Sequence, residues 1–112
     1  MYIKIYQIDM SKDTANRAFR GIDEICSVEK ISSDDFFVDW ASYRKVFEGD
    51  VDCADLEDVY VLLNTRKPKG FSGHLLSVSD IVAVKNADDG TFTYAYVDSI
   101  GYKEVDGTDA PV

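Results

Sequence analysis

The sequence is poor in the residues that build metal centres and disulfide frameworks. Its 112 residues include two cysteines, Cys26 and Cys53, and a single histidine, His74. Structural zinc sites take about four Cys or His ligands at short spacings, so we expect neither a metal nor a cofactor. Two widely separated cysteines without a secretory signal are typical of reduced, buried thiols, and they predict a cytoplasmic protein.

Long hydrophobic runs are also missing. No stretch approaches the ~18 apolar residues of a membrane span, and the opening residues MYIKIYQID alternate like a strand instead of forming the apolar core of a signal peptide. The sequence therefore predicts no membrane association.

Basic residues are scarce, with 12 Lys and Arg against 21 Asp and Glu and a net charge of −9. Proteins that bind nucleic acid neutralise phosphates with Lys and Arg, so the balance argues against bulk binding of that kind. Acidity of this size favours solubility. Two more specific explanations of the acidity are a surface that binds a basic partner and a surface that imitates the charge of a nucleic acid.

Hydrophobic residues make up 46% of the chain, which is enough for the core of one domain of this length. Periodicity predicts an α+β fold in the order β-α-β-α-β-β-β, a mainly antiparallel sheet with two helices packed on it. We expect one domain over residues 1–105 and a flexible tail or linker over 106–112. The expected strands are 2–8, 43–47, 81–85, 92–97 and 102–105, and the expected helices are 11–26 and 52–64.

Capping residues and side-chain spacing refine the helices. Ser11 is a plausible N-cap for the first and Asp55 for the second, and Arg17 and Arg20 fall on the outer, solvated side of the first. Residues 36–40 read as either a strand or an apolar turn. We expect the neighbouring aromatic residues, Trp40, Tyr43 and Phe47, to be part of the core.

The most informative stretch is Phe71 to Val105. The Asp89-Gly90 pair marks a tight turn between two alternating strands, and polar residues gather before the first strand and after the second. We predict that residues 71–80 and 98–102 lie close together and form the functional surface. Its polar members are His74, Ser77, Ser79, Asp80, Asp98 and Ser99.

A series of segments forms a recognisable pattern: Tyr6-Gln7, Arg17-Ala18-Phe19, Tyr43 to Gly49, Leu56 to Tyr60 with Asn64, Pro68, Phe71, Gly73-His74, Leu76 to Val82 and Tyr96 to Tyr102. Together they resemble the YodL-like domain family, over nearly the whole chain. The resemblance implies a bacterial, cytosolic module, often part of multi-domain proteins of mobile elements, whose activity is not established; no catalytic residues come with it. Leu75 departs from the pattern, which more often has a small residue there.

A hydrolase is the weakest of three functional hypotheses. His74, Ser77 and Asp80 supply an imidazole, a hydroxyl and a carboxylate, but the sequence has neither a G-x-S-x-G elbow nor a second histidine. Ser and Asp side chains at the entry to a strand more commonly satisfy backbone groups.

A PUA-like nucleic-acid-binding domain is the second hypothesis, by analogy of fold alone. Its contacts would be the basic patch Arg66, Lys67 and Lys69 with His74, beside the stacking rings of Tyr94, Tyr96 and Tyr102.

The leading hypothesis is a non-catalytic protein-interaction module that serves as an accessory of a bacterial mobile element. An acidic surface with many tyrosines and an edge strand suits protein recognition.

Overall fold

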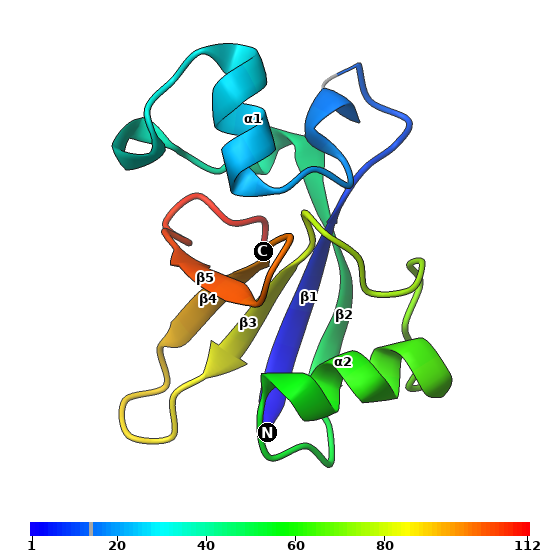
Figure 1. The fold of residues 1–112 in the computed structure, drawn as a ribbon. Helices are drawn as coiled ribbons and strands as arrows, with labels where there is room; N and C mark the ends of the chain where they lie inside the picture. Colours follow the sequence, from blue (N-terminus) through cyan, green and yellow to red (C-terminus); the bar gives the residue numbers. More distant parts are fainter. Residues whose placement is uncertain (14) are drawn as a thin grey trace.

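The computed structural model describes residues 1–13 and 15–112, and these form a five-stranded antiparallel sheet with two α-helices (Figure 1). The element order is β-α-β-α-β-β-β, which confirms the predicted α+β fold. The strands lie side by side in the order β2-β1-β3-β4-β5. The elements are β1 Tyr2–Ile8, α1 Ile22–Glu29, β2 Tyr43–Asp50, α2 Leu56–Thr65, β3 Ile81–Lys85, β4 Phe92–Val97 and β5 Tyr102–Val105, with short 3₁₀ turns at Ala15–Arg17, Ser33–Asp35 and Trp40–Ser42.

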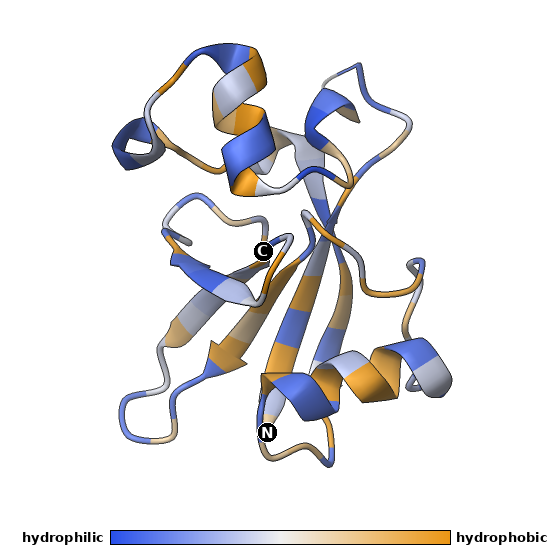
Figure 2. Cartoon of the chain, in the orientation of Figure 1, coloured by the Kyte–Doolittle hydropathy of each residue, from blue (hydrophilic) through white to orange (hydrophobic). Residues whose placement is uncertain are grey.

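The central strand β1 sends alternate side chains into two different cores. Ile3 and Ile5 pack with Val59 and Leu63 of α2, whereas Tyr6 and Ile8 join a second cluster that includes Ile22 of α1. Alternation places successive strand residues on opposite faces, and it is visible as alternating bands along β1 in Figure 2. Each helix therefore covers a different part of the sheet, α2 beside the lower ends of β1 and β2 and α1 above their upper ends (Figure 1).

A β-bulge in β2 explains why the aromatic residues near it divide between the two core clusters. Ile5 pairs with Phe47 and Tyr6 with Lys45, so Val46 has no partner in the register. An extra residue of this kind reverses the alternation. Phe47 therefore joins the α2 cluster, while Trp40 and Tyr43 join the α1 cluster. The prediction that these three rings are core residues is confirmed, in two clusters.

The predicted first helix is wrong at its beginning. The α-helix starts at Ile22, and the residues before it form one 3₁₀ turn and a sharp bend. Ser11 does not cap a helix, because its N–H and hydroxyl both donate to Asp9 Oδ1. Phe19 has a φ of 65° and cannot continue a right-handed helix.

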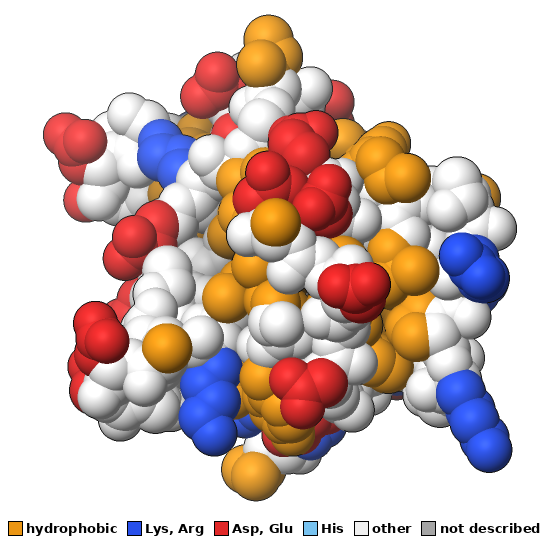
Figure 3. Space-filling view, turned by 90° about the horizontal axis from the view of Figure 1, so that it is seen from below, with side chains coloured by type: hydrophobic (Ala, Val, Ile, Leu, Met, Phe, Trp, Pro, Cys, Tyr) orange, Lys and Arg blue, Asp and Glu red, His pale blue; other side chains and the backbone are white. Residues whose placement is uncertain are grey.

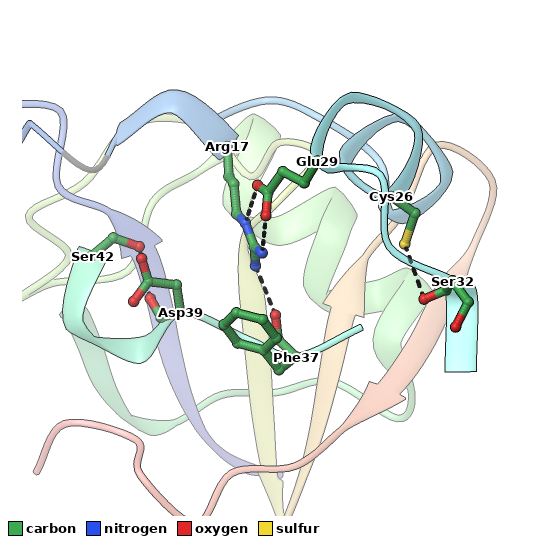
Figure 4. A network of polar contacts seen from close by, with 7 residues as sticks. All are labelled: Arg17, Cys26, Glu29, Ser32, Phe37, Asp39 and Ser42. Atoms are coloured by element: carbon green, nitrogen blue, oxygen red, sulfur yellow. Dashed lines mark hydrogen bonds and ion pairs between the residues drawn. The ribbon is translucent and has the colours of Figure 1, made fainter. Parts of the chain in front are cut away.

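Arg17 is buried, contrary to the prediction of a solvated face. Its side chain donates to both carboxylate oxygens of Glu29 at 2.7 Å and, also at 2.7 Å, to the carbonyl of Phe37 (Figure 4). The guanidinium also lies over the Phe36 and Phe37 rings. Arg17 therefore fastens α1 to the segment 36–40, which is neither strand nor helix before Trp40. Arg20 forms only a half-exposed pair with Glu24.

Residues 106–112, predicted as a tail or linker, lie against the sheet in the structure. The Trp40 indole donates to the carbonyl of Asp106 at 2.9 Å, and the Tyr6 hydroxyl donates to the carbonyl of Pro111 at 3.0 Å. Gly107 packs so closely on the Tyr94 ring that a Cβ would lie 2.1 Å from a ring carbon. The segment thus covers aromatic residues on the α1 side of the sheet.

The remaining elements are present as predicted, but α2 begins at Leu56 instead of at residue 52 and β2 continues to Asp50 instead of ending at residue 47. β3, β4 and β5 have the expected bounds. The Asp55 side chain caps α2 by accepting from the N–H of Asp58 at 2.9 Å, as its position before the helix indicated.

Candidate functional site

The segments predicted to meet lie together at one end of the sheet. The N–H of Ser79 donates to the carbonyl of Val97 at 2.9 Å, and the N–H of Val97 donates to the carbonyl of Asp80 at 2.8 Å. These bonds extend the β3–β4 pairing past Ile81. Asp80 therefore lies opposite Val97, the last residue of β4, and Asp98 follows Val97 directly. The predicted proximity to residues 98–102 is confirmed for residues 77–80, whereas Phe71 and Ser72 contact β2, the opposite edge strand.

Gln7, which we did not predict as a site residue, connects this end of the sheet. Its side chain is 1% exposed. The carboxamide oxygen accepts from the N–H of His74 at 3.1 Å, and the carboxamide nitrogen donates to the carbonyl of His74 at 2.9 Å and to Asp80 Oδ2 at 3.0 Å. Gly73 allows this approach, because a Cβ there would lie 2.1 Å from Gln7 Oε1. A glutamine on the strand face shared with Ile3 and Ile5 was the available sequence signal.

Asp80 is buried, with 1% of its surface exposed, and its carboxyl accepts from the N–H of Ser77 at 2.8 Å as well as from Gln7. Burial raises the pKa of Asp80 to about 8, although both hydrogen bonds act to lower it. The desolvation of a carboxylate outweighs two neutral donors. Asp80 is therefore largely protonated at neutral pH, and no cation pairs with it in the described residues.

We expect Asp80→Asn to flatten the pH dependence of stability. In the folded protein Asp80 keeps its proton to about pH 8, whereas in the unfolded chain it loses it near pH 4. Unfolding thus releases a proton between these values, and the free energy of unfolding falls as pH rises, by up to about 1.4 kcal/mol per pH unit. Asparagine retains an acceptor for both donors and does not titrate.

Urea unfolding at several pH values between about 5.5 and 7.5 measures this difference. The native protein should lose stability across the range and the Asp80→Asn variant should lose clearly less. Carboxylates whose pKa is lowered, such as Glu29, act below this range and in the opposite direction. Equal slopes in the two proteins would show that Asp80 is ionised when folded.

Ser79 holds two chain segments in a strained arrangement. Its φ is 83°, and its hydroxyl accepts from the N–H of Phe19, which has a φ of 65°. Its carbonyl accepts from the Tyr43 hydroxyl at 2.6 Å. Left-handed backbone is costly for non-glycine residues, so these bonds must stabilise the bend. The Phe19 ring stays half exposed and lies 5.4 Å from the His74 ring.

The His74 and Ser77 side chains do not face one another as a hydrolase relay requires. His74 Nδ1 lies 2.7 Å from the carbonyl oxygen of Leu75, and the Ser77 hydroxyl donates to that same oxygen at 2.9 Å. Asp80 contacts Gln7 and the Ser77 backbone instead of the imidazole. These groups therefore satisfy backbone positions of the 74–80 loop.

Asp98 and Ser99 hold the start of α1. Gly21 precedes the helix and has no side chain to cap it, and Asp98 Oδ1 accepts from the N–H of Ile22 at 3.0 Å and from that of Ser99 at 2.8 Å. A carboxylate at a helix N-terminus is favoured by the helix dipole. Asp98 thus caps α1 from a distant loop, and Gly21 is needed because a Cβ would lie 2.1 Å from Ser99 Oγ.

A hollow of about 260 Å³ lies beside these residues, between α2 and the β4–β5 turn. Tyr60 of α2, which is exposed, and Val78 contribute apolar surface to it. The turn that borders it carries Ile100, which is 94% exposed. The lining is Glu57, Tyr60, Ser77, Val78, Val97, Asp98, Ser99, Gly101 and Tyr102.

The chain matches the sequence model of a known family over nearly its whole length. The model of the YodL-like domain matches residues 2–107. The chain belongs to the YodL-like domain family. No curated protein and no solved structure shows significant similarity to it.

In this YodL-like domain, the basic patch and the tyrosines do not meet. Lys67 donates to the carbonyl of Gly73 and lies over the Phe71 ring, which packs on Phe47 of β2. Tyr94, Tyr96 and Tyr102 belong to β4 and β5, at the opposite side of the sheet. Figure 3 shows acidic side chains over the middle and left of the lower face, with Lys and Arg at its right and also among the acidic residues on its left.

Within residues 1–13 and 15–112, no three or more His, Cys, Asp and Glu side chains are grouped to hold a metal ion. Over the same ranges, no helix has the length and apolar character to cross a membrane.

Proposed function

We propose that the YodL-like domain is a non-catalytic module that binds another protein through the hollow between α2 and the β4–β5 turn. The observation that carries this proposal is Ile100, a large apolar residue that is 94% exposed at the tip of that turn. An apolar side chain that a partner buries next to a hollow is the kind of anchor that dominates the binding energy of protein contacts.

The turn is held firmly enough to present this side chain. The N–H of Asp98 donates to the carbonyl of Gly101 at 3.0 Å, and the Asp98 carboxylate joins the turn to α1. Gly101 supplies the left-handed φ of 67° that closes the turn. A preorganised contact residue binds with a smaller entropic cost.

The polar residues around the hollow support a binding role in a different way. Asp80, Ser79 and Ser77 are engaged in hydrogen bonds that shape the 74–80 loop. They fix the position of Val78 and the wall of the hollow. A partner would contact the apolar side chains of Ile100, Tyr60 and Val78 together with polar groups of the lining, such as Glu57 and Ser99.

We expect Ile100→Asp to abolish partner capture without affecting folding. The immobilised domain would be exposed to a bacterial lysate at low salt, and a protein retained by it would be identified and tested again in purified form. A charge at the centre of an apolar contact should weaken binding by about tenfold or more. The matched control is Val61→Asp, on the exposed side of α2.

The two variants distinguish the outcomes. A purified partner that binds both variants alike would exclude the Ile100 surface. Recovery of nucleic acid that is released by modest salt would favour the PUA-like alternative and the Arg66, Lys67 and Lys69 patch. The wider setting, an accessory role in a bacterial mobile element in the cytoplasm, remains part of the proposal.

A further inference from the structure

A second cavity, of about 440 Å³, lies between β5 and the segment 33–40. We infer that it is the binding groove for an extended basic peptide, which pairs with the free edge of β5 and places an aliphatic side chain in the cavity. This inference goes beyond the Ile100 surface and does not depend on it. The lining is Ile22, Ser33, Phe36, Phe37, Val38, Trp40, Lys103, Glu104, Val105, Asp106, Thr108 and Asp109.

β5 is an edge strand whose outer side has no partner strand in the part of the chain that the structure describes. The N–H of Asp98 bonds to the carbonyl of Gly101, and Tyr96 is opposite Lys103. Hydrogen-bonded pairs alternate in an antiparallel ladder, so Lys103 and Val105 bond to β4. The N–H and C=O groups of Tyr102 and Glu104 consequently point outward, where a peptide strand can add to the sheet.

The cavity reaches this edge. Lys103, Glu104 and Val105 all line it, although consecutive strand side chains point to opposite faces. A cavity bounded by three consecutive residues extends around the side of the strand. A peptide paired with Glu104 would therefore direct alternate side chains toward the cavity.

The opposite wall is apolar and fixed in place. Phe36, Phe37 and Trp40 supply aromatic surface. Arg17 holds this wall through its bonds to Glu29 and to the Phe37 carbonyl, with the Phe37 ring lying against the guanidinium (Figure 4). Such a preformed pocket suits an anchoring side chain.

Charge identifies the peptide as basic. Three lining residues are acidic, Glu104, Asp106 and Asp109, and one, Lys103, is basic. Asp106 is firmly ionised, because hydrogen bonds from Thr108 lower the pKa of its carboxyl. Lysine or arginine side chains at alternate peptide positions would meet these carboxylates, and the aromatic wall also attracts cations.

Trp40, the only tryptophan of the chain, lines the cavity and reports on its occupancy. The test titrates the whole protein with a capped peptide of alternating lysine and valine. We expect a saturable change in tryptophan fluorescence, together with slower hydrogen exchange at the amides of Tyr102 and Glu104. Glu104→Lys should weaken binding by about fivefold or more, because it replaces attraction by repulsion at the paired edge.

Matched controls separate strand pairing from attraction to an acidic protein. Asp52→Lys makes the same change in net charge near the end of β2, the opposite edge strand, and should alter affinity by less than about twofold. The same peptide with alternate amides methylated should bind much more weakly, since it cannot pair. Equal binding of the methylated peptide, equal effects of the two substitutions, or no saturable signal would each overturn the inference.

Discussion

Replacing Gln7 by leucine is expected to lower the free energy of unfolding by about 3 kcal/mol or more. The Gln7 side chain makes hydrogen bonds to the N–H and C=O of His74 and to Asp80. Each group left without a partner in a buried site costs roughly 1–3 kcal/mol. The additional apolar surface of leucine recovers only a part of this. Urea denaturation monitored by Trp40 fluorescence measures the change.

Two further variants make the Gln7 result specific. Arg44→Leu changes a polar residue to leucine at the position opposite Gln7 in the register, but on an exposed side chain, and should alter stability by less than about 0.5 kcal/mol. Gly73→Ala should destabilise the native protein, because its Cβ meets Gln7 Oε1, and should do so less in the Gln7→Leu background. Additive effects would contradict the role given to this contact.

The second large effect is expected for Arg17→Met, a loss of about 3 kcal/mol. Arg17 is buried, and its removal leaves the partly exposed Glu29 carboxylate and the Phe37 carbonyl without their donors. Methionine retains much of the aliphatic contact, so the loss reports mainly on the polar bonds. Thermal and urea unfolding of the purified protein provide the measurement.

Arg20 offers the control for this substitution. It lies three residues away and pairs with Glu24, but both side chains of that pair are largely exposed. Exposed pairs of this type contribute about 0.5 kcal/mol or less, so Arg20→Met should be nearly neutral. Similar losses at Arg17 and Arg20 would mean that the Glu29 pair is as weak as a surface pair.

The sheet and second helix could be predicted because their signals are local. β3 and β4 alternate and are joined by a turn with Asp89-Gly90, and Asp55 stands directly before α2. Strand pleating, turn chemistry and capping act over a few residues. These features therefore required no knowledge of distant contacts.

The prediction of the first helix was wrong because a distant contact, and not a local signal, decides where this helix begins. Ala15, Ala18, Phe19 and Ile22 have helical spacing, but the chain bends at Phe19, whose N–H bonds to Ser79 sixty residues later. Arg17 becomes buried through the same rearrangement. A tertiary bond here outweighs a weak local preference, and no pattern within residues 11–26 reveals it.

For the candidate site, the sequence predicted that Asp80 and Asp98 lie close together, but it did not predict their hydrogen-bond partners. Asp80 and Asp98 were expected to lie together from their positions at the ends of two paired strands. Their partners, Gln7 and the N–H of Ile22, come from remote parts of the chain. The signal for Gln7 was present, a polar residue on an otherwise apolar strand face, whereas the role of Gly21 depended on the exact approach of α1.

The position of β1 in the middle of the sheet has a consequence for synthesis on the ribosome. β1 forms one ladder with β2, which follows within about 50 residues, and another with β3, where Ile3 meets Val84. Until residues 81–85 have been translated, one side of β1 is an unpaired edge, a recognised hazard for association between chains. A stalled nascent chain that ends before β3 should therefore be a substrate for chaperones, and a chain that includes β3 should be protected from them.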